Sequence, residues 1–319
     1  MISASKLNNT GFKWVLIGFI FTLLWSSAST ATKIGLKVAQ PLTIALMRFL
    51  IASVCMLIYA HIIRGYPLPG AREWKKITIY GIFNITIYLG LYVLAMKDVT
   101  AGIGALAIAT SPIFIGLLSV IVLKQIPPAK VIAALLLGLL GVVVAAWPLL
   151  HGTGVSVKGL VILLIGMLSY SLASIYFNKT DWQGLKILTI NGWQTLIGGM
   201  LLLPFLCMTY HKEANHFTAD FWISSGWLAI FVSIAAIQCW LWLLKSAPIK
   251  AGMWLYLCPI FGFIIAAVFM DDPLSLYTLT GVVMVLLALV MVRGKRPRQK
   301  AELQQKQAEL THTQQSLSE

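Results

Sequence analysis

One permanently charged side chain, Arg48, lies inside a long apolar run. It follows the start of that run by about six residues, which is roughly 9 Å along a helix at 1.5 Å rise per residue. A permanent cation at such a depth in a bilayer costs about 2.5–3.5 kcal/mol on insertion scales unless it faces water or a partner. We therefore expect Arg48 to point into a helical bundle. It would there either bond to backbone carbonyls or line a solute pathway, and both interpretations stay open.

Other polar and aromatic residues recur at helical spacing inside apolar segments. Asn84, Tyr88 and Tyr92 are four residues apart, which places them on one face of a helix. Aromatic rings with a few amide and hydroxyl groups suit a small zwitterionic or weakly polar solute, and aromatic faces also hold ammonium groups. The candidate pathway residues are Trp25, Lys33, Arg48, Asn84, Tyr88, Tyr92, Ser111, Tyr170, Gln194, Gln238, Trp242, Trp254 and Tyr256. The alternative is structural: polar residues join transmembrane helices, and aromatic residues gather at membrane interfaces.

The residue types used in enzyme and metal chemistry are not arranged for it. The four Cys residues lie in apolar runs without metal-binding spacing, and the five His residues have no carboxylate at helical spacing. No glycine-rich nucleotide-binding loop occurs. The sequence therefore predicts no catalytic residue, no metal and no cofactor. Because no acid lies in the middle of an apolar run, proton coupling, exchange and facilitated diffusion stay open as alternatives.

The composition is that of a polytopic membrane protein. Of 319 residues 59% are hydrophobic and 11% are charged, whereas soluble domains are about one quarter charged. Ten apolar runs predict membrane-spanning helices near 13–32, 42–63, 75–96, 101–123, 129–148, 159–178, 186–209, 219–244, 250–270 and 275–292. Most of the 24 Lys and Arg residues fall on the side of the two termini, which predicts that both termini are cytoplasmic. Because the cations are scattered over short loops and a tail, we expect no nucleic-acid partner despite the net charge of +14.

Two segments of the chain match one another. Residues 111–131 and 258–278 align without gaps, and each begins with Pro-Ile-Phe, at Pro112 and Pro259. Both prolines are predicted hinges. Each segment ends in a polar pair, which is Lys124–Gln125 in the first and Asp271–Asp272 in the second. Five helices are an odd number, so the copies would have inverted topology, a recurrent architecture of secondary transporters.

The expected fold is therefore an all-α integral membrane protein, with ten transmembrane helices in a 5+5 inverted-topology repeat. The expected domains are a cytoplasmic N-terminus at 1–12, a first five-helix repeat at 13–148, a second at 159–292 and a basic, Gln-rich cytoplasmic tail at 293–319.

At this point the chain resembles the EamA-type transporters of the drug/metabolite transporter superfamily. The resemblance lies in Trp25, Lys33, Pro41, Arg48 and Phe49, in "LYVLAMKDVTAGIGALAIATSPIF", and in "NGWQTLIGGMLLLP" and "LLKSAPIKAGMWLYLCPIFG" of the second half. It implies a ten-helix carrier that exports amino acids, other metabolites or toxic compounds. The family's Gly-Glu pairs after the fourth and ninth helices are replaced here by Lys124–Gln125 and Asp271–Asp272.

The resulting functional prediction is a multi-pass secondary transporter of the inner membrane that exports amino acids or related small metabolites by alternating access. Its partners would be a small-molecule solute and the lipid bilayer, and a homodimer is left open. The alternatives are an importer or exchanger of a nucleotide-like or cationic metabolite, and a membrane scaffold without transport activity.

Overall fold

The computed structural model describes residues 4–108, 110–111, 114–115, 117–118, 129–150, 155–246, 248–271 and 275–292. Every regular element among these residues is helical, as the apolar runs predict. The Lys124–Gln125 pair, Asp272, Pro112 and the tail from Arg293 onward lie outside the described residues. The proposed alignment of 111–131 with 258–278 is therefore not tested by the structure.

The helices follow one another with short connections. In the first half they are α1 (Ala4–Ser26), α2 (Ala28–Leu36), α3 (Pro41–Leu57), η1 (Ile58–Ile63), α4 (Ala71–Gly81), η2 (Ile82–Leu89), α5 (Gly90–Ala95), α6 (Ala101–Ile108) and α8 (Ala129–Leu150). In the second half they are α9 (Val157–Lys179), α10 (Ile187–Met200), α11 (Leu203–Thr209), η3 (Lys212–Ala214), α12 (Ala219–Gly226), η4 (Trp227–Ala236), α13 (Ile237–Ser246), α14 (Pro248–Met270) and α15 (Leu276–Val292).

Six continuous helical stretches among the described residues are long and apolar enough to cross a membrane. They are Phe12–Leu36, Pro41–Ile63, Ala71–Ala95, Val157–Lys179, Ile187–Thr209 and Ala219–Trp240. Three shorter apolar helices, Ile132–Ala145, Leu257–Met270 and Leu276–Ala288, fall within three more of the predicted spans. The described part of the remaining span begins with α6. Large apolar side chains such as Ile62, Met208 and Val268 face outward, as expected of a surface that meets lipid.

The first membrane helix is longer than the sequence predicts. We expected it to end near residue 32, with Lys33 in the loop beyond it, but the helix continues through α2 to Leu36. The small residues of α2 allow this, since Ala28, Ser29 and Ala31 are buried against neighbouring helices. The next helix begins at Pro41, whose fixed φ suits the first helical position.

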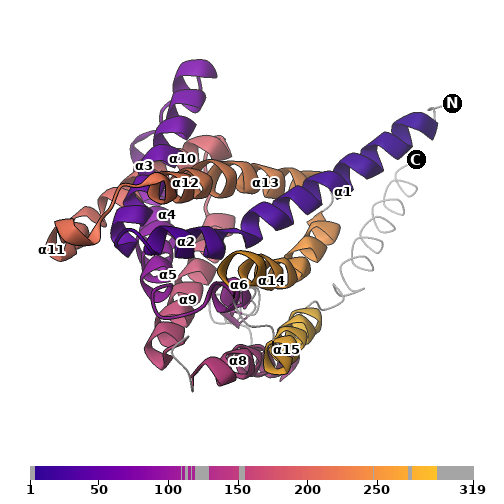
Figure 1. Ribbon diagram of the computed structural model, residues 1–319. Coiled ribbons are helices and arrows are strands. Elements are labelled where there is room, and N and C mark those ends of the chain that lie inside the picture. Colours follow the sequence, from indigo (N-terminus) through magenta and orange to yellow (C-terminus); the bar gives the residue numbers. More distant parts are fainter. Residues whose placement is uncertain are drawn as a thin grey trace, which may run out of the picture.

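The packing pairs elements of the first half with elements of the second. Helix α3 packs on α10, α6 packs on α14, and α8 packs on α15. In addition, η2 and α5 pack on α9, while α12, η4 and α13 pack on α1 and α2. Figure 1 shows α8 and α15 side by side at the lower edge of the view, apart from α3, α4 and α10. The molecule thus has a crossing region around α3 and α10 and a separate α8–α15 pair.

Three segments widen into π-helix: η1, η2 and η4. A π-helical turn shifts the register of the helix and alters which groups its carbonyls can bond to, and such turns are frequent at functional sites. The Ser169 hydroxyl, for example, donates to the Phe83 carbonyl of η2 at 2.8 Å. Pro259, one of the two predicted hinges, lies inside α14.

Candidate functional site

A cavity of about 230 Å³ lies at the crossing of helices from both halves of the chain. Its polar and phenolic lining residues are Arg48, Tyr80, Asn84, Tyr88, Tyr92, Tyr170, Ser174, Asn178, Asn191, Gln194, Thr195 and Ser233. The cavity is smaller than the roughly 300–1,000 Å³ typical of sites for drug-sized ligands. Its size therefore suits a small solute.

One wall of the cavity carries the cation of Arg48. The Nε atom of Arg48, on α3, donates to the Ser233 hydroxyl of η4 at 2.9 Å. The side chain is only 9% exposed, and its guanidinium lies 5.8 Å from the centre of the Phe49 ring. Among the described residues, no carboxylate lies within ion-pair distance of it. The sequence prediction that Arg48 points into the bundle is thus correct.

A chain of amides forms another part of the lining. The Asn84 Nδ2 atom donates to Gln194 Oε1 at 3.2 Å, and the Gln194 Nε2 atom donates to Asn191 Oδ1 at 3.0 Å. Gln194 is 2% exposed. The chain connects η2 to α10, so it joins the two halves of the bundle and presents hydrogen-bonding groups to the cavity.

Aromatic rings form the remaining surfaces. The ring centres of Tyr88 and Tyr170 are 4.9 Å apart, and those of Tyr88 and Tyr92 are 6.2 Å apart. Trp25 and Trp240 line the cavity from α1 and α13, and both rings pack against Phe21 behind them. Such faces offer apolar contact and cation–π contact to a solute.

The Tyr92 hydroxyl lies at the edge of the cavity and is enclosed, since Tyr92 is 3% exposed. Its neighbour there is the hydroxyl of Ser29 on α2, which is fully buried. Buried polar groups are normally paired in folded proteins. The Ser29 hydroxyl therefore accounts for the polar end of the Tyr92 side chain.

A second, wider cavity of about 720 Å³ lies where η1 ends and α10 begins. Its lining includes Arg64, Lys186, Tyr59, Gln238 and Trp242. Ile187 lines this cavity and the first one, so the two spaces adjoin. We call the wider space the vestibule.

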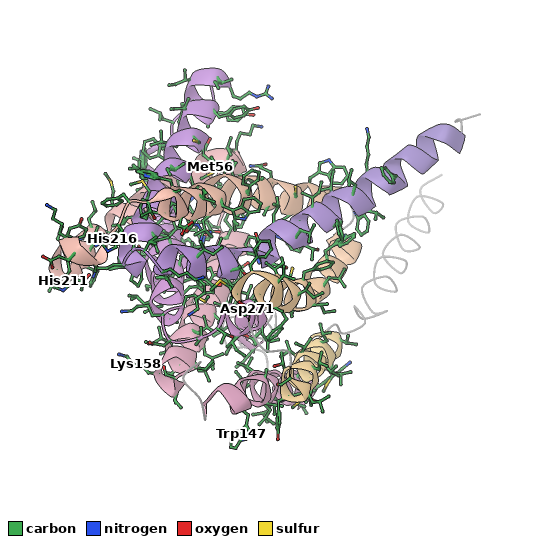
Figure 2. The ribbon with its side chains drawn as sticks, viewed as in Figure 1. Met56, Trp147, Lys158, His211, His216 and Asp271 are labelled. Atoms are coloured by element: carbon green, nitrogen blue, oxygen red, sulfur yellow. The ribbon has the colours of Figure 1, made fainter. Side chains whose placement is uncertain are left out.

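At the opposite end of the bundle, hydrogen bonds around Gln40 join two loops. Its backbone N–H donates to Asn215 Oδ1 at 2.9 Å, and its Oε1 accepts from the His211 N–H at 2.9 Å and from Asn215 Nδ2 at 2.7 Å. The His216 N–H also donates to the Val38 carbonyl at 2.8 Å. These bonds tie the loop after α2 to the loop after α11; Figure 2 labels His211 and His216 at that end of α11.

Seven of the thirteen predicted pathway residues line the first cavity. These are Trp25, Arg48, Asn84, Tyr88, Tyr92, Tyr170 and Gln194. Gln238 and Trp242 line the vestibule instead.

Three other predicted residues, Lys33, Ser111 and Trp254, line neither cavity. Lys33 donates from Nζ to the Met96 carbonyl at 2.9 Å, near the end of α5, where a cation complements the helix dipole. The Ser111 hydroxyl contacts Met167 Sδ at 3.5 Å. Trp254 packs on Trp14, with ring centres 5.7 Å apart. The side chain of Tyr256 lies outside the part of the chain that the structure describes.

Several lining residues were missed by the sequence prediction. Ser233, Ile237 and Trp240 are spaced four and three residues apart, which places them on one face of the eighth predicted helix. Gln238, one of the two residues that we selected there, is five residues after Ser233 and lines the vestibule instead. Asn191 is three residues before Gln194, and this spacing could have identified it.

Nothing in the described chain resembles a metal or redox centre. No group of three or more His, Cys, Asp or Glu side chains comes together among the described residues. All four cysteines are free, and they range from exposed Cys55 to buried Cys258.

Comparison with known proteins decides the family. The sequence profile of the EamA-like transporter family matches residues 12–147 and again residues 157–294. The chain belongs to this family. Its general role is therefore that of a membrane transporter, which is not an enzyme class.

Its relatives are named as transporters in the same general terms. The chain is 25% identical over 288 residues to the uncharacterized transporter YvbV of Bacillus subtilis, covering 90% of this chain and 93% of the relative. It is 26% identical over 285 residues to the uncharacterized inner membrane transporter YedA of Escherichia coli K12, covering 87% and 90%. A solved crystal structure matches with a TM-score of 0.62 at 19% identity, covering 88% of this chain and 96% of that chain. That likeness concerns the fold alone.

Proposed function

We propose that this EamA-family protein is a secondary transporter of the inner membrane that exports amino acids or related small metabolites by alternating access. The observation that carries the proposal is the cavity between α3, η2, α9, α10 and η4, where a buried cation, an amide chain and aromatic rings meet. These groups offer one contact each for a charged group, a polar group and an apolar portion of a small solute.

The helix pairing supports the 5+5 inverted arrangement that alternating access would use. Helices α3, α6 and α8 each pack on the element in the corresponding place of the second half, namely α10, α14 and α15. The third helix of each half packs on the first helix of the other, since η2 packs on α9 and η4 on α1. A two-fold axis would produce this reciprocal pairing, and the family profile also matches the chain twice. Inverted repeats that rock around a fixed central site are a recurrent transport mechanism.

The π-helical segments support a site between the two halves. Segments η2 and η4 lie in the third helix of each half, and both line the cavity, through Asn84 and Tyr88 on one side and Ser233 on the other. Elements with irregular hydrogen bonding are suited to changes of register when the halves move.

The direction of export is supported by the vestibule. Its cations, Arg64 and Lys186, belong to the side that the positive-inside bias places in the cytoplasm. In this conformation the cavity adjoins that side through Ile187, while Gln40 closes the opposite end. A solute would therefore enter from the cytoplasm, and the bonds of Gln40 would break for release. A cationic metabolite fits this site less well, because Arg48 would repel it.

The test is flux through the full chain in liposomes. Vesicles of both orientations would be loaded with radiolabelled L-amino acids and small carboxylic acids, and protein-free vesicles of the same lipid would serve as the control. We expect saturable flux that unlabelled solute inhibits, with the lower KM on the vestibule side. Flux equal to that of the protein-free vesicles across the whole panel would overturn the proposal.

A further inference from the structure

The charge of Arg48 is the least explained feature of the cavity. A buried cation is expensive to desolvate, and proteins normally balance it with an acid. The described residues supply none, and the one hydrogen bond of the side chain uses Nε. The two terminal nitrogens make no hydrogen bond with the described chain. Neither of them is among the unpaired side-chain atoms that are fully enclosed by the protein. They are therefore open to the cavity that Arg48 lines.

We infer that Arg48 binds the carboxylate of the transported solute, and that the solute class is defined by this carboxylate more than by an ammonium group. The inference rests on the proposed function, because it assigns a ligand to the same cavity. A guanidinium matches a carboxylate in shape, with two parallel N–H donors facing two oxygens. The solute would thus supply the countercharge that the chain lacks.

Ser233 is the positioning residue for this contact. Its hydroxyl accepts from Arg48 Nε at 2.9 Å and so limits rotation of the guanidinium. It lies on η4, whereas Arg48 lies on α3, so the contact also connects the two halves of the bundle. A carboxylate held by Arg48 would therefore sit where η4 meets α3.

The vestibule, which adjoins the cavity, is positively charged, as Arg48 is. The vestibule carries Arg64 and Lys186, and no acid is among its lining residues. Cations at the mouth of a cleft raise the local concentration of anions. An anionic solute would meet these cations first and Arg48 second. It would pass Ile187, which lines both the vestibule and the central cavity.

An ammonium group would find weaker contacts in the cavity. The described lining offers it the amide oxygens of Asn84, Asn178, Asn191 and Gln194 and the faces of Tyr88 and Tyr170, but no carboxylate. The site should therefore retain a hydroxy or keto acid that lacks the amino group. It should reject an amine or amide that lacks the carboxylate.

The experiment measures binding separately from transport. Thermal unfolding of the purified full chain in lipid nanodiscs would be followed with the twenty L-amino acids, their carboxamides, and the hydroxy acids lactate and phenyllactate. Titration of the most stabilising acid and its carboxamide would then give dissociation constants. We expect the carboxamide to bind about ten- to a hundredfold more weakly, the range for a hydrogen bond to a charged group.

Variants assign the effect to Arg48. Arg48→Gln should lose the discrimination between acid and carboxamide, Arg48→Lys should keep part of it, and Ser233→Ala should weaken acid binding about threefold to tenfold. Arg72→Gln is the matched control, because Arg72 is exposed and lines neither cavity. If Arg48→Gln does not fold, Arg48→Lys and Ser233→Ala give the same comparison.

The outcomes separate the two claims. Equal binding of acid and carboxamide, stabilisation by inorganic phosphate in place of carboxylates, or no stabilisation by any acid would overturn the inference. Saturable flux that is equal for solutes with and without a carboxylate would overturn the inference while leaving the transporter proposal intact. Acid binding that depends on Arg48, in a protein without saturable flux, would support the inference and contradict the proposed function.

Discussion

The α8–α15 pair and the cavity region are built from the same kind of apolar helix, yet only the second encloses a cavity. In the pair, Gly141 and Gly281 bring two backbones together, and small or β-branched residues such as Ala145 and Val285 fill the contact. Close contacts also occur beside the cavity, since a Cβ atom at Gly81 would lie 2.9 Å from the Gln194 carbonyl oxygen. There, however, the side chains of Tyr88 and Gln194 line an open space. Glycine thus marks close helix contacts in both regions, and the polar and aromatic side chains distinguish the region that has room for a solute.

The comparison also assigns different roles to the two regions. None of the described side chains of the pair lines either cavity, and its outer surface is apolar, with Leu136, Leu140 and Trp147 exposed; Figure 2 shows Trp147 pointing away from the bundle. Substitutions in the pair should therefore change stability. Substitutions in the cavity should change solute binding while the protein remains folded.

The largest effect is expected from Gly281→Leu. A Cβ atom at this position would run into the Gly141 carbonyl oxygen and lie 2.7 Å from the Ala145 backbone nitrogen. Since both are backbone atoms, the helices would have to separate. We expect a loss of about 3 kcal/mol or more in unfolding free energy, measured as the yield of monodisperse protein and its unfolding temperature in detergent.

Val283→Leu is the control for this substitution. It lies on the same helix, is 53% exposed and should leave the unfolding temperature unchanged. If Gly281→Leu were as stable as Val283→Leu, the close contact of α8 and α15 would not be a structural requirement, and the contrast between the two regions would fail.

A middle-sized effect is expected from Gln194→Leu. The variant removes the centre of the amide chain, which bonds to Asn84 and Asn191 at once. Each neutral hydrogen bond contributes about 0.5–1.5 kcal/mol. We therefore expect solute affinity to fall about threefold to tenfold, measured as KM in the flux assay.

Gln238→Leu sharpens this comparison because it makes the same change in the vestibule. The sequence analysis selected both glutamines, whereas the structure puts only Gln194 in the central cavity. Gln238→Leu should change KM by less than about twofold. A larger effect than that of Gln194→Leu would mean that the solute is bound in the vestibule.

The sequence identified the parts of the site whose position follows from local spacing. Asn84 and Tyr88 share a helical face, and Arg48 had to point inward because a lone cation in lipid is costly. Lys33 and Trp254 line neither cavity, and their surroundings depend on residues distant in sequence: Met96 for Lys33 and Trp14 for Trp254.

The apolar runs likewise predicted where helices occur, but not the helix type within each span. Hydropathy located the membrane helices of the described chain, although it ended the first of them before α2. It does not report the π-helical segments η2 and η4, which change the facing of residues within a span. Ser233, the partner of Arg48, was also missed, although its spacing to Ile237 and Trp240 is that of one helical face.

The smallest effect is expected from Gln40→Ala, at the closed end of the bundle. The variant removes the side-chain bonds to His211 and Asn215, together with one to the Thr209 carbonyl at 2.8 Å. Although Gln40 immediately precedes α3, it lines neither space, and KM should therefore stay unchanged. The maximal flux should change by about twofold to fivefold, since partly exposed hydrogen bonds contribute little each. Gln183→Ala, in the exposed loop between α9 and α10, is the matched control. A changed KM in Gln40→Ala would mean that this end of the bundle contacts the solute. Solute binding would then not be confined to the central cavity.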